Sequence, residues 1–305
     1  MLTFASDDGT RIYVHSWLPA AAPRAVLQIS HGMSEHAGRY GELASAFVAR
    51  GWAVYANDHR GHGRSIANGD ELGHMADDDG FGRSVADVHS LNRYIAEQHG
   101  GAPRVMLGHS MGSFFLQRIL ADHPDDAVGF AFSGSNGKPP PIAAAGRVIA
   151  RAERARLGKR GKSAILKTLS FDDFNKRFKP NRTEFDWISR DENEVDKYVA
   201  DPLCGFSCTV QSWIALLDAL PRLTSPEVVS RIPKHKPVYL FAGTDDPVGG
   251  RAGVRSLADA YRGEWLTDVE LRLYEGARHE TLHETNKQEV IDNLLTWCDR
   301  VVSRS

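Results

Sequence analysis

The chain has 305 residues, of which 42% are hydrophobic and 25% charged, a composition typical of a globular protein with a sizeable core. Its formal net charge of −2 gives no overall attraction to nucleic acid, which argues against a nucleic-acid partner. The odd set of Cys204, Cys208 and Cys298 does not form a disulfide framework and predicts reduced thiols in a cytoplasmic protein. The start of the chain does not resemble a signal peptide, and no apolar run is long enough to span a bilayer.

Strand-like and helix-like segments alternate through the first 136 residues. Residues 12–18 alternate apolar and polar and predict an antiparallel strand, whereas short apolar runs predict buried parallel strands. Apolar residues recurring every three or four positions predict the helices between these strands. The buried strands are expected at residues 25–29, 53–56, 105–107 and 128–132, and the helices before Gly51 and at residues 81–95 and 111–123.

This alternation stops at the run of residues 137–141, which contains three prolines, and resumes near residue 227. Strands are then expected at residues 238–242 and 269–274, and helices at residues 254–261 and 290–302. The sequence predicts an α/β fold with a mostly parallel central β-sheet flanked by helices. Residues 1–136 and 227–305 would form this core, and residues 137–226 a helical cap inserted into it.

The segment Gly108-His109-Ser110-Met111-Gly112 has the pattern G-x-S-x-G, with a predicted strand before it and a predicted helix after it. In this context the pattern is typical of a nucleophile elbow, a sharp turn that exposes a serine hydroxyl. The flanking glycines allow the strand and the helix to approach closely. We therefore predict that Ser110 is a catalytic nucleophile.

A serine nucleophile requires a histidine that accepts its proton and an acid that orients the histidine. Two later strands end in loops that carry these residue types, Asp245-Asp246-Pro247 after residues 238–242 and His279 after residues 269–274. The order serine, acid, histidine fits a parallel sheet of this kind. His279 is the predicted base. Asp246, whose following proline favours a tight turn, is preferred over Asp245 as the acid.

The tetrahedral intermediate also needs hydrogen-bond donors for its oxyanion. The predicted donors are the backbone N–H groups of Met111, which follows the nucleophile, and of Met33, in the loop that begins His31-Gly32.

The residues His279-Glu280-Thr281-Leu282-His283 also match the zinc-protease motif H-E-x-x-H. That motif requires both histidines on one face of a helix, but His279 directly follows a strand and a Glu-Gly-Ala turn. We therefore predict no metal ion and no cofactor.

Several segments together resemble the α/β-hydrolase family, specifically its branch of monoacylglycerol lipases, lysophospholipases and serine aminopeptidase S33-type hydrolases. They are residues 30–40 (SHGMSEHAGRY), the loop at residues 58–65, GHSMG, the sequence Gly243 to Asp246, and YEGARH at residues 274–279. The resemblance implies an α/β-hydrolase fold, a mobile helical cap, the triad Ser110, Asp246 and His279, and the amides of Met33 and Met111 as the oxyanion hole. The cap is basic and then acidic, unlike a uniformly apolar membrane-docking cap, so peripheral membrane contact is an open expectation.

The expected function is hydrolysis of carboxylic esters through an acyl-enzyme, on a small lipid-like substrate such as a monoacylglycerol or lysophospholipid. An aminopeptidase or an acyltransferase on the same scaffold is an alternative, and so is a catalytically silent binding module. The sequence leaves the oligomeric state open. Apolar cap residues expected to contact the acyl chain are Leu166, Phe171, Phe174, Trp213, Ile214 and Leu217.

Overall fold

The computed structural model of the chain describes residues 2–66, 72–139 and 142–304. These residues form one sheet with the strand order β1-β2-β4-β3-β5-β6-β7-β8. β2 pairs antiparallel with β1 and β4, and all other neighbouring strands are parallel. The strands are β1 Leu2–Ala5, β2 Arg11–Trp17, β3 Ala25–Ser30, β4 Trp52–Asn57, β5 Arg104–His109, β6 Gly129–Ser133, β7 Val238–Gly243 and β8 Val269–Tyr274.

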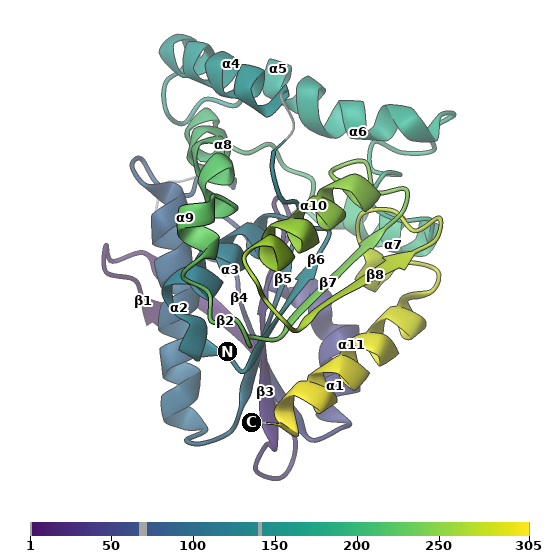
Figure 1. The fold of residues 1–305 in the computed structure, drawn as a ribbon. Helices are drawn as coiled ribbons and strands as arrows, with labels where there is room; N and C mark the ends of the chain where they lie inside the picture. Colours follow the sequence, from purple (N-terminus) through teal and green to yellow (C-terminus); the bar gives the residue numbers. More distant parts are fainter. Residues whose placement is uncertain (1, 67–71, 140–141, 305) are drawn as a thin grey trace.

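Helices cover both faces of this sheet (Figure 1). Met106 of β5 packs in the apolar cluster that contains α2, α3 and α10, whereas its neighbours Val105 and Leu107 pack with α1 and α11. This alternation follows from the two-residue period of a strand and places the sheet between two apolar layers. The core helices are α1 Gly41–Val48, α2 Gly80–Gln98, α3 Met111–Asp122, α10 Gly250–Gly263 and α11 Lys287–Val302, with 3₁₀ turns at Ala37–Tyr40, Pro124–Asp126 and Thr281–His283.

The predicted α/β-hydrolase architecture is confirmed, and each strand and core helix expected from the sequence forms near its expected position. The sequence analysis missed β1, which has only four residues and is half exposed, so it carries little hydrophobic signal. β1 is defined by its pairing with β2, a contact that local pattern does not reveal.

The segment between β6 and β7 is helical, and no strand occurs in its described residues, 134–139 and 142–237. Pro140 and Pro141, at the start of the predicted cap, lie outside the described residues. In Figure 1, α4, α5 and α6 lie across the top of the molecule. The helices of this region are α4 Ile142–Leu157, α5 Ala164–Lys167, α6 Asp173–Asn175, α7 Glu192–Ala200, α8 Val210–Leu223 and α9 Pro226–Val229, with a π-helical turn at Thr168–Asp172 and a 3₁₀ turn at Lys176–Phe178.

The cap has small apolar clusters of its own and one helix that it shares with the core. Leu166 and Ile214 pack with Ala150 of α4, while Leu216 and Leu223, also on α8, join the cluster that lies over the sheet. Helix α8 therefore packs against both the cap and the core.

Cys204, Cys208 and Cys298 are free thiols, in agreement with the sequence. None of the helices in the described part of the chain is both long and apolar enough to cross a membrane.

Candidate active site

Ser110 stands at the turn between β5 and α3 in a strained backbone conformation. Its φ of +48° and ψ of −120° lie in a region that non-glycine residues rarely adopt. The Ser110 N–H donates to the Ser133 carbonyl at 2.9 Å and so fixes the turn against β6. A Cβ atom on Gly112 would lie 2.1 Å from the Ser30 carbonyl oxygen, and one on Gly108 would lie 2.6 Å from the backbone of α3. The two glycines are required because the strand and the helix leave no room for a side chain.

Asp246 and His279 follow β7 and β8 and lie against each other. Asp246 Oδ1 and His279 Nδ1 are 2.9 Å apart, and the two side chains are buried. Asp245 is exposed, so Asp246 is the aspartate that meets the histidine. His279 and Ser110 line the same cavity, although the hydrogen bonds of the described residues include none between them. Such a contact often tightens only when substrate is bound.

The surroundings of His279 raise its pKa. Burial by itself would lower the pKa of this imidazole, but the charge of Asp246 and its hydrogen bond outweigh the burial. The carboxylates of Glu280 and Glu35 act in the same direction. With Asp246 bound to Nδ1, the other ring nitrogen, Nε2, is left to exchange a proton with a nucleophile.

The loop after β3 lies close to Ser110. A Cβ atom on Gly32 would be 3.3 Å from Ser110 Cβ, and Met33 and Met111 both line the cavity around Ser110. The structure thus places Met33 and Met111, the two residues predicted to supply the oxyanion donors, in the same cavity as Ser110.

A cavity of about 280 Å³ extends from Ser110 into the cap. Its wall is mainly apolar on the cap side, with contributions from α4, α5 and α8. Of the six cap residues expected to contact substrate, Ile214 is not part of this wall and instead packs inside the cap, in the cluster that contains Ala150 and Val210. The five that do line the cavity are Leu166, Phe171, Phe174, Trp213 and Leu217.

A buried ionic cluster forms the polar end of the cavity. Arg39 donates to Glu35 Oε2 at 2.7 Å and to the two carboxylate oxygens of Glu280 at 2.8 and 2.6 Å. Burial would raise the pKa of Glu35 and Glu280, but Arg39 holds the pKa of each below its ordinary value, so the two carboxyls are ionised.

The sequence analysis gave no role to Trp187 or Tyr198 of the cap. The Trp187 ring lies 5.2 Å from the His279 ring between centroids, and Tyr198 lies 4.8 Å from the Arg39 guanidinium. Glu35 and Arg39 belong to the segment of residues 30–40 that was noted only for its resemblance. These contacts join residues that are distant along the chain, so local sequence patterns do not predict them.

The geometry of residues 279–283 differs from that of a zinc-protease motif. Only Thr281–His283 form a helical turn. His283 Nδ1 lies 3.3 Å from Glu280 while His279 faces Asp246, so the two histidines do not share one helical face.

Among the described residues, metal-ligating atoms also gather in two groups that share His36. In one of them His36 Nε2 is already bound to Asp201 at 2.9 Å, so the pair is satisfied by itself. The groups are His15, His36 and Asp58, and His36, Asp201 and Cys204.

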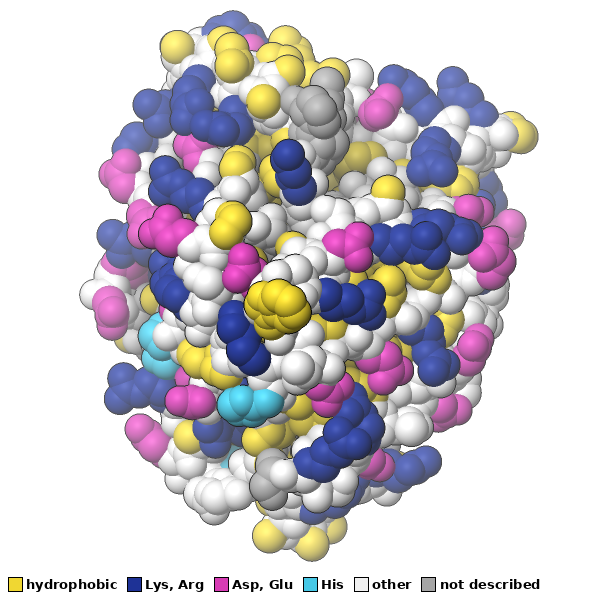
Figure 2. Space-filling model, in the orientation of Figure 1, with side chains coloured by type: hydrophobic (Ala, Val, Ile, Leu, Met, Phe, Trp, Pro, Cys, Tyr) yellow, Lys and Arg dark blue, Asp and Glu magenta, His cyan; other side chains and the backbone are white. Residues whose placement is uncertain are grey.

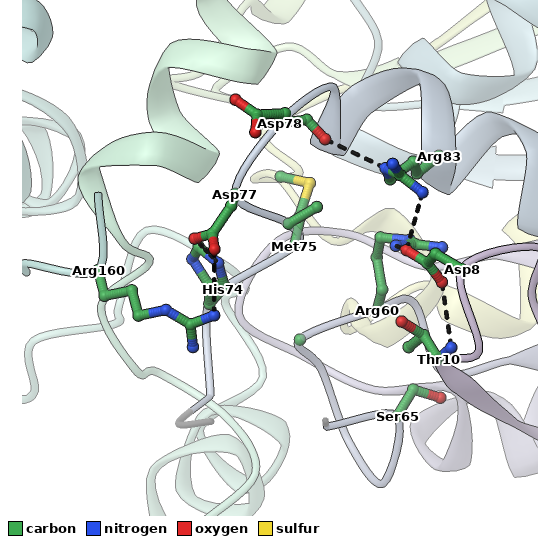
Figure 3. A pocket seen from close by; sticks show the side chains of 12 residues that line it. Asp8, Thr10, Arg60, Ser65, His74, Met75, Asp77, Asp78, Arg83 and Arg160 are labelled. Atoms are coloured by element: carbon green, nitrogen blue, oxygen red, sulfur yellow. Dashed lines mark hydrogen bonds and ion pairs between the residues drawn. The ribbon is translucent and has the colours of Figure 1, made fainter. Parts of the chain in front are cut away.

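A second cavity, of about 270 Å³, lies away from Ser110 where the core meets the cap. Figure 3 shows Asp8 beside Arg60 and Arg83, at 2.8 and 3.0 Å, and Arg160 of the cap extending toward Asp77, at 3.6 Å. The pairs of Asp8 lie within the core, whereas the pair of Arg160 and Asp77 joins the cap to the core. We interpret it as an ionic contact between core and cap.

These features define an α/β-hydrolase fold with a helical segment inserted between β6 and β7 and with Ser110 at the turn between β5 and α3. The family model described as "Serine aminopeptidase, S33" matches residues 21–286, and the chain belongs to this family. A monoacylglycerol lipase of Mycolicibacterium smegmatis is 31% identical, over 97% of this chain and 95% of the relative. A human monoglyceride lipase is 30% identical, over 91% of this chain and 82% of the relative. In structure, the chain is similar to a thermostable carboxyl esterase from Bacillus coagulans in complex with glycerol, with a TM-score of 0.89, 26% identity and coverage of 99% and 98%.

We predict that Gly112→Ala destabilises the protein by roughly 3 kcal/mol or more, because the new methyl group meets backbone atoms that cannot move aside. The measurement is the free energy of unfolding in denaturant. Gly41→Ala is the matched control, since a Cβ atom there meets nothing within 4 Å. Equal stabilities of the two variants would contradict the described elbow.

We predict that Asp246→Asn lowers the pKa of His279, because burial remains while the attracting charge is lost. Histidine NMR titration measures this pKa, with His279→Gln used to assign the signal. Asp245→Asn should leave it near the wild-type value, since Asp245 is exposed. A larger shift in Asp245→Asn than in Asp246→Asn would show that the assignment of the acid is wrong.

Proposed function

We propose that the protein hydrolyses carboxylic esters through an acyl-enzyme on Ser110, with Asp246 and His279 as the other members of a catalytic triad. The observation that carries the proposal is the buried Asp246–His279 pair beside a strained serine, at the base of an apolar cavity. The similarity to monoacylglycerol lipases and to a carboxyl esterase supports the same chemistry.

In this mechanism Ser110 Oγ attacks the ester carbonyl carbon while His279 Nε2 takes the hydroxyl proton. Asp246 stabilises the resulting imidazolium, and the amides of Met33 and Met111 donate to the oxyanion. The tetrahedral intermediate collapses as His279 returns the proton to the leaving alcohol. Water then attacks the acyl-enzyme by the same route and releases the fatty acid.

We propose a lipid-like substrate such as a monoacylglycerol, whose acyl chain occupies the apolar part of the cavity. The polar end, near Glu35 and Glu280, would receive the alcohol part. A lysophospholipid is the near alternative, since the basic side chains of α4 could attract its phosphate group.

An aminopeptidase would need a free carboxylate for the substrate's ammonium group, but Glu35 and Glu280 already share Arg39. This pairing favours an ester over a peptide, and an acyltransferase would share the same first half-reaction.

We infer that residues 1–136 and 227–305 form a core and that residues 137–226 form a cap. We also propose that the protein is cytoplasmic, because its three thiols are free and free thiols persist in that compartment.

Figure 2 shows hydrophobic side chains beside basic ones over the top of the molecule, where α4 and α5 lie. Val148, Ile165 and Leu169 are exposed there. Such a surface supports peripheral contact of the cap with a lipid surface.

The experiment compares turnover of p-nitrophenyl esters from acetate to decanoate with turnover of aminoacyl anilides. We predict that kcat/KM for esters rises with acyl length, exceeds that for the anilides, and is lost in Ser110→Ala. Faster turnover of the anilides would overturn the ester assignment.

The cap should set the preferred length. Leu217→Trp, which fills the cavity, is expected to lower kcat/KM for the decanoate about 10-fold while sparing the acetate. Ile165→Trp is the matched control, because Ile165 is exposed and does not line the cavity. An unchanged length preference in Leu217→Trp would place the acyl chain elsewhere.

A further inference from the structure

The loop that carries Met33 is held by the cap as well as by the core. Ser34 has a φ of +59°, a left-handed conformation that a residue with a Cβ atom keeps only when its surroundings stabilise it. The surroundings of Ser34 come from the cap. Its carbonyl oxygen accepts hydrogen bonds from Tyr198 Oη at 2.8 Å and from the Gly205 N–H at 2.9 Å, and its hydroxyl donates to the Phe206 carbonyl at 2.7 Å.

The other side of the same loop is held by the core. The Gly32 N–H donates to Glu35 Oε1 at 2.5 Å, and His31 Nδ1 lies 2.8 Å from the Gly32 carbonyl oxygen. Because the His59 N–H donates to His31 Nε2, the proton of this ring is on Nδ1 and is donated to Gly32. The peptide group between Gly32 and Met33 is therefore fixed through its own carbonyl.

Met33 lies between these two anchors. Its N–H belongs to the peptide group whose carbonyl, that of Gly32, is held by His31. Glu35 holds the preceding peptide group through the Gly32 N–H, and Tyr198 holds the carbonyl of the following residue, Ser34. Arg39 contacts both Glu35 and Tyr198: it donates a hydrogen bond to Glu35, and its guanidinium lies 4.8 Å from the Tyr198 ring. Tyr198 is only 4% exposed, so its hydroxyl has no access to bulk water as a substitute partner.

We propose that Tyr198 of the cap and Glu35 of the core are positioning residues that hold residues 32–34 so that the Met33 N–H points at the oxyanion. The inference rests on the proposed ester hydrolysis, and it gives the cap a role in catalysis as well as in substrate binding. The cap does not only shape the acyl cavity; it completes the oxyanion site. Movement of the segment containing Tyr198 and Gly205 away from the core would release Ser34 and lower the rate of the chemical step.

The test measures kcat and KM for p-nitrophenyl acetate, whose acyl group is too short to reach deep into the cap. In Tyr198→Phe, which loses only the hydroxyl, kcat should fall about 10-fold or more while KM stays within about twofold. Tyr239→Phe is the matched control, since its buried hydroxyl hydrogen-bonds to Tyr274 Oη at 3.4 Å, inside the sheet. It should keep kcat within about twofold of the wild type, and melting temperatures show that each variant is folded.

Glu35 supplies a second, independent test. Gln at this position keeps an oxygen that can accept the Gly32 N–H, so Glu35→Gln should retain more of kcat than Glu35→Ala. Equal losses in the two variants would assign the effect to charge alone and overturn the positioning role of Glu35.

The outcomes separate this inference from the proposed function. If the wild type turns over esters but Tyr198→Phe keeps its kcat, or raises KM alone, the positioning role of Tyr198 is wrong and the function stands. If the folded wild type shows no turnover of any ester in the series, the proposed function fails and the inference fails with it.

Discussion

The first turn of α3 lies in backbone contact with the end of β3, and the rest of the site depends on this contact. It requires glycine at position 112, where a Cβ atom would be 2.1 Å from the Ser30 carbonyl oxygen. It also bends the chain at Ser110 into a conformation that only tight surroundings can maintain. As a consequence, Ser110 lies close to the loop after β3, where a Cβ atom on Gly32 would be 3.3 Å from Ser110 Cβ.

Burial sets the electrostatics of the site, and charge pairs decide which groups are ionised. The imidazole of His279 is buried, which by itself lowers its pKa, and the charge of Asp246 raises the pKa again. The carboxylates of Glu35 and Glu280 are buried as well, and Arg39, which donates hydrogen bonds to both, keeps them charged. The cavity therefore combines an ionised, internally satisfied polar end with an apolar cap, which suits a neutral ester with one long chain.

Much of this architecture could be predicted from the sequence, because its signals are local. The elbow is a five-residue pattern, and Asp246 and His279 were expected at the site because each lies in the loop that follows a predicted strand. β1 was missed because a four-residue strand at the sheet edge has little pattern of its own. Ile214 has the spacing of a cavity residue, but the rotation of α8 turns it into the cap.

The contacts that join cap and core could not be predicted. Tyr198 reaches Ser34 across 164 residues of sequence, and Trp187 reaches His279. Neither side chain differs in its local pattern from an ordinary core aromatic. Their positions depend on how the inserted helices pack, which the sequence of a single chain does not encode in any short motif.

The central claim is that Ser110 is a nucleophile activated by the Asp246–His279 pair. The most direct measurement is intact-protein mass after treatment with a fluorophosphonate, followed by peptide mapping of the adduct. We predict one adduct on the peptide that contains Ser110, no adduct in Ser110→Ala, and much slower labelling in Asp246→Asn. A folded wild-type protein that stays unlabelled, or a Ser110→Ala variant labelled at the wild-type rate, would contradict the account.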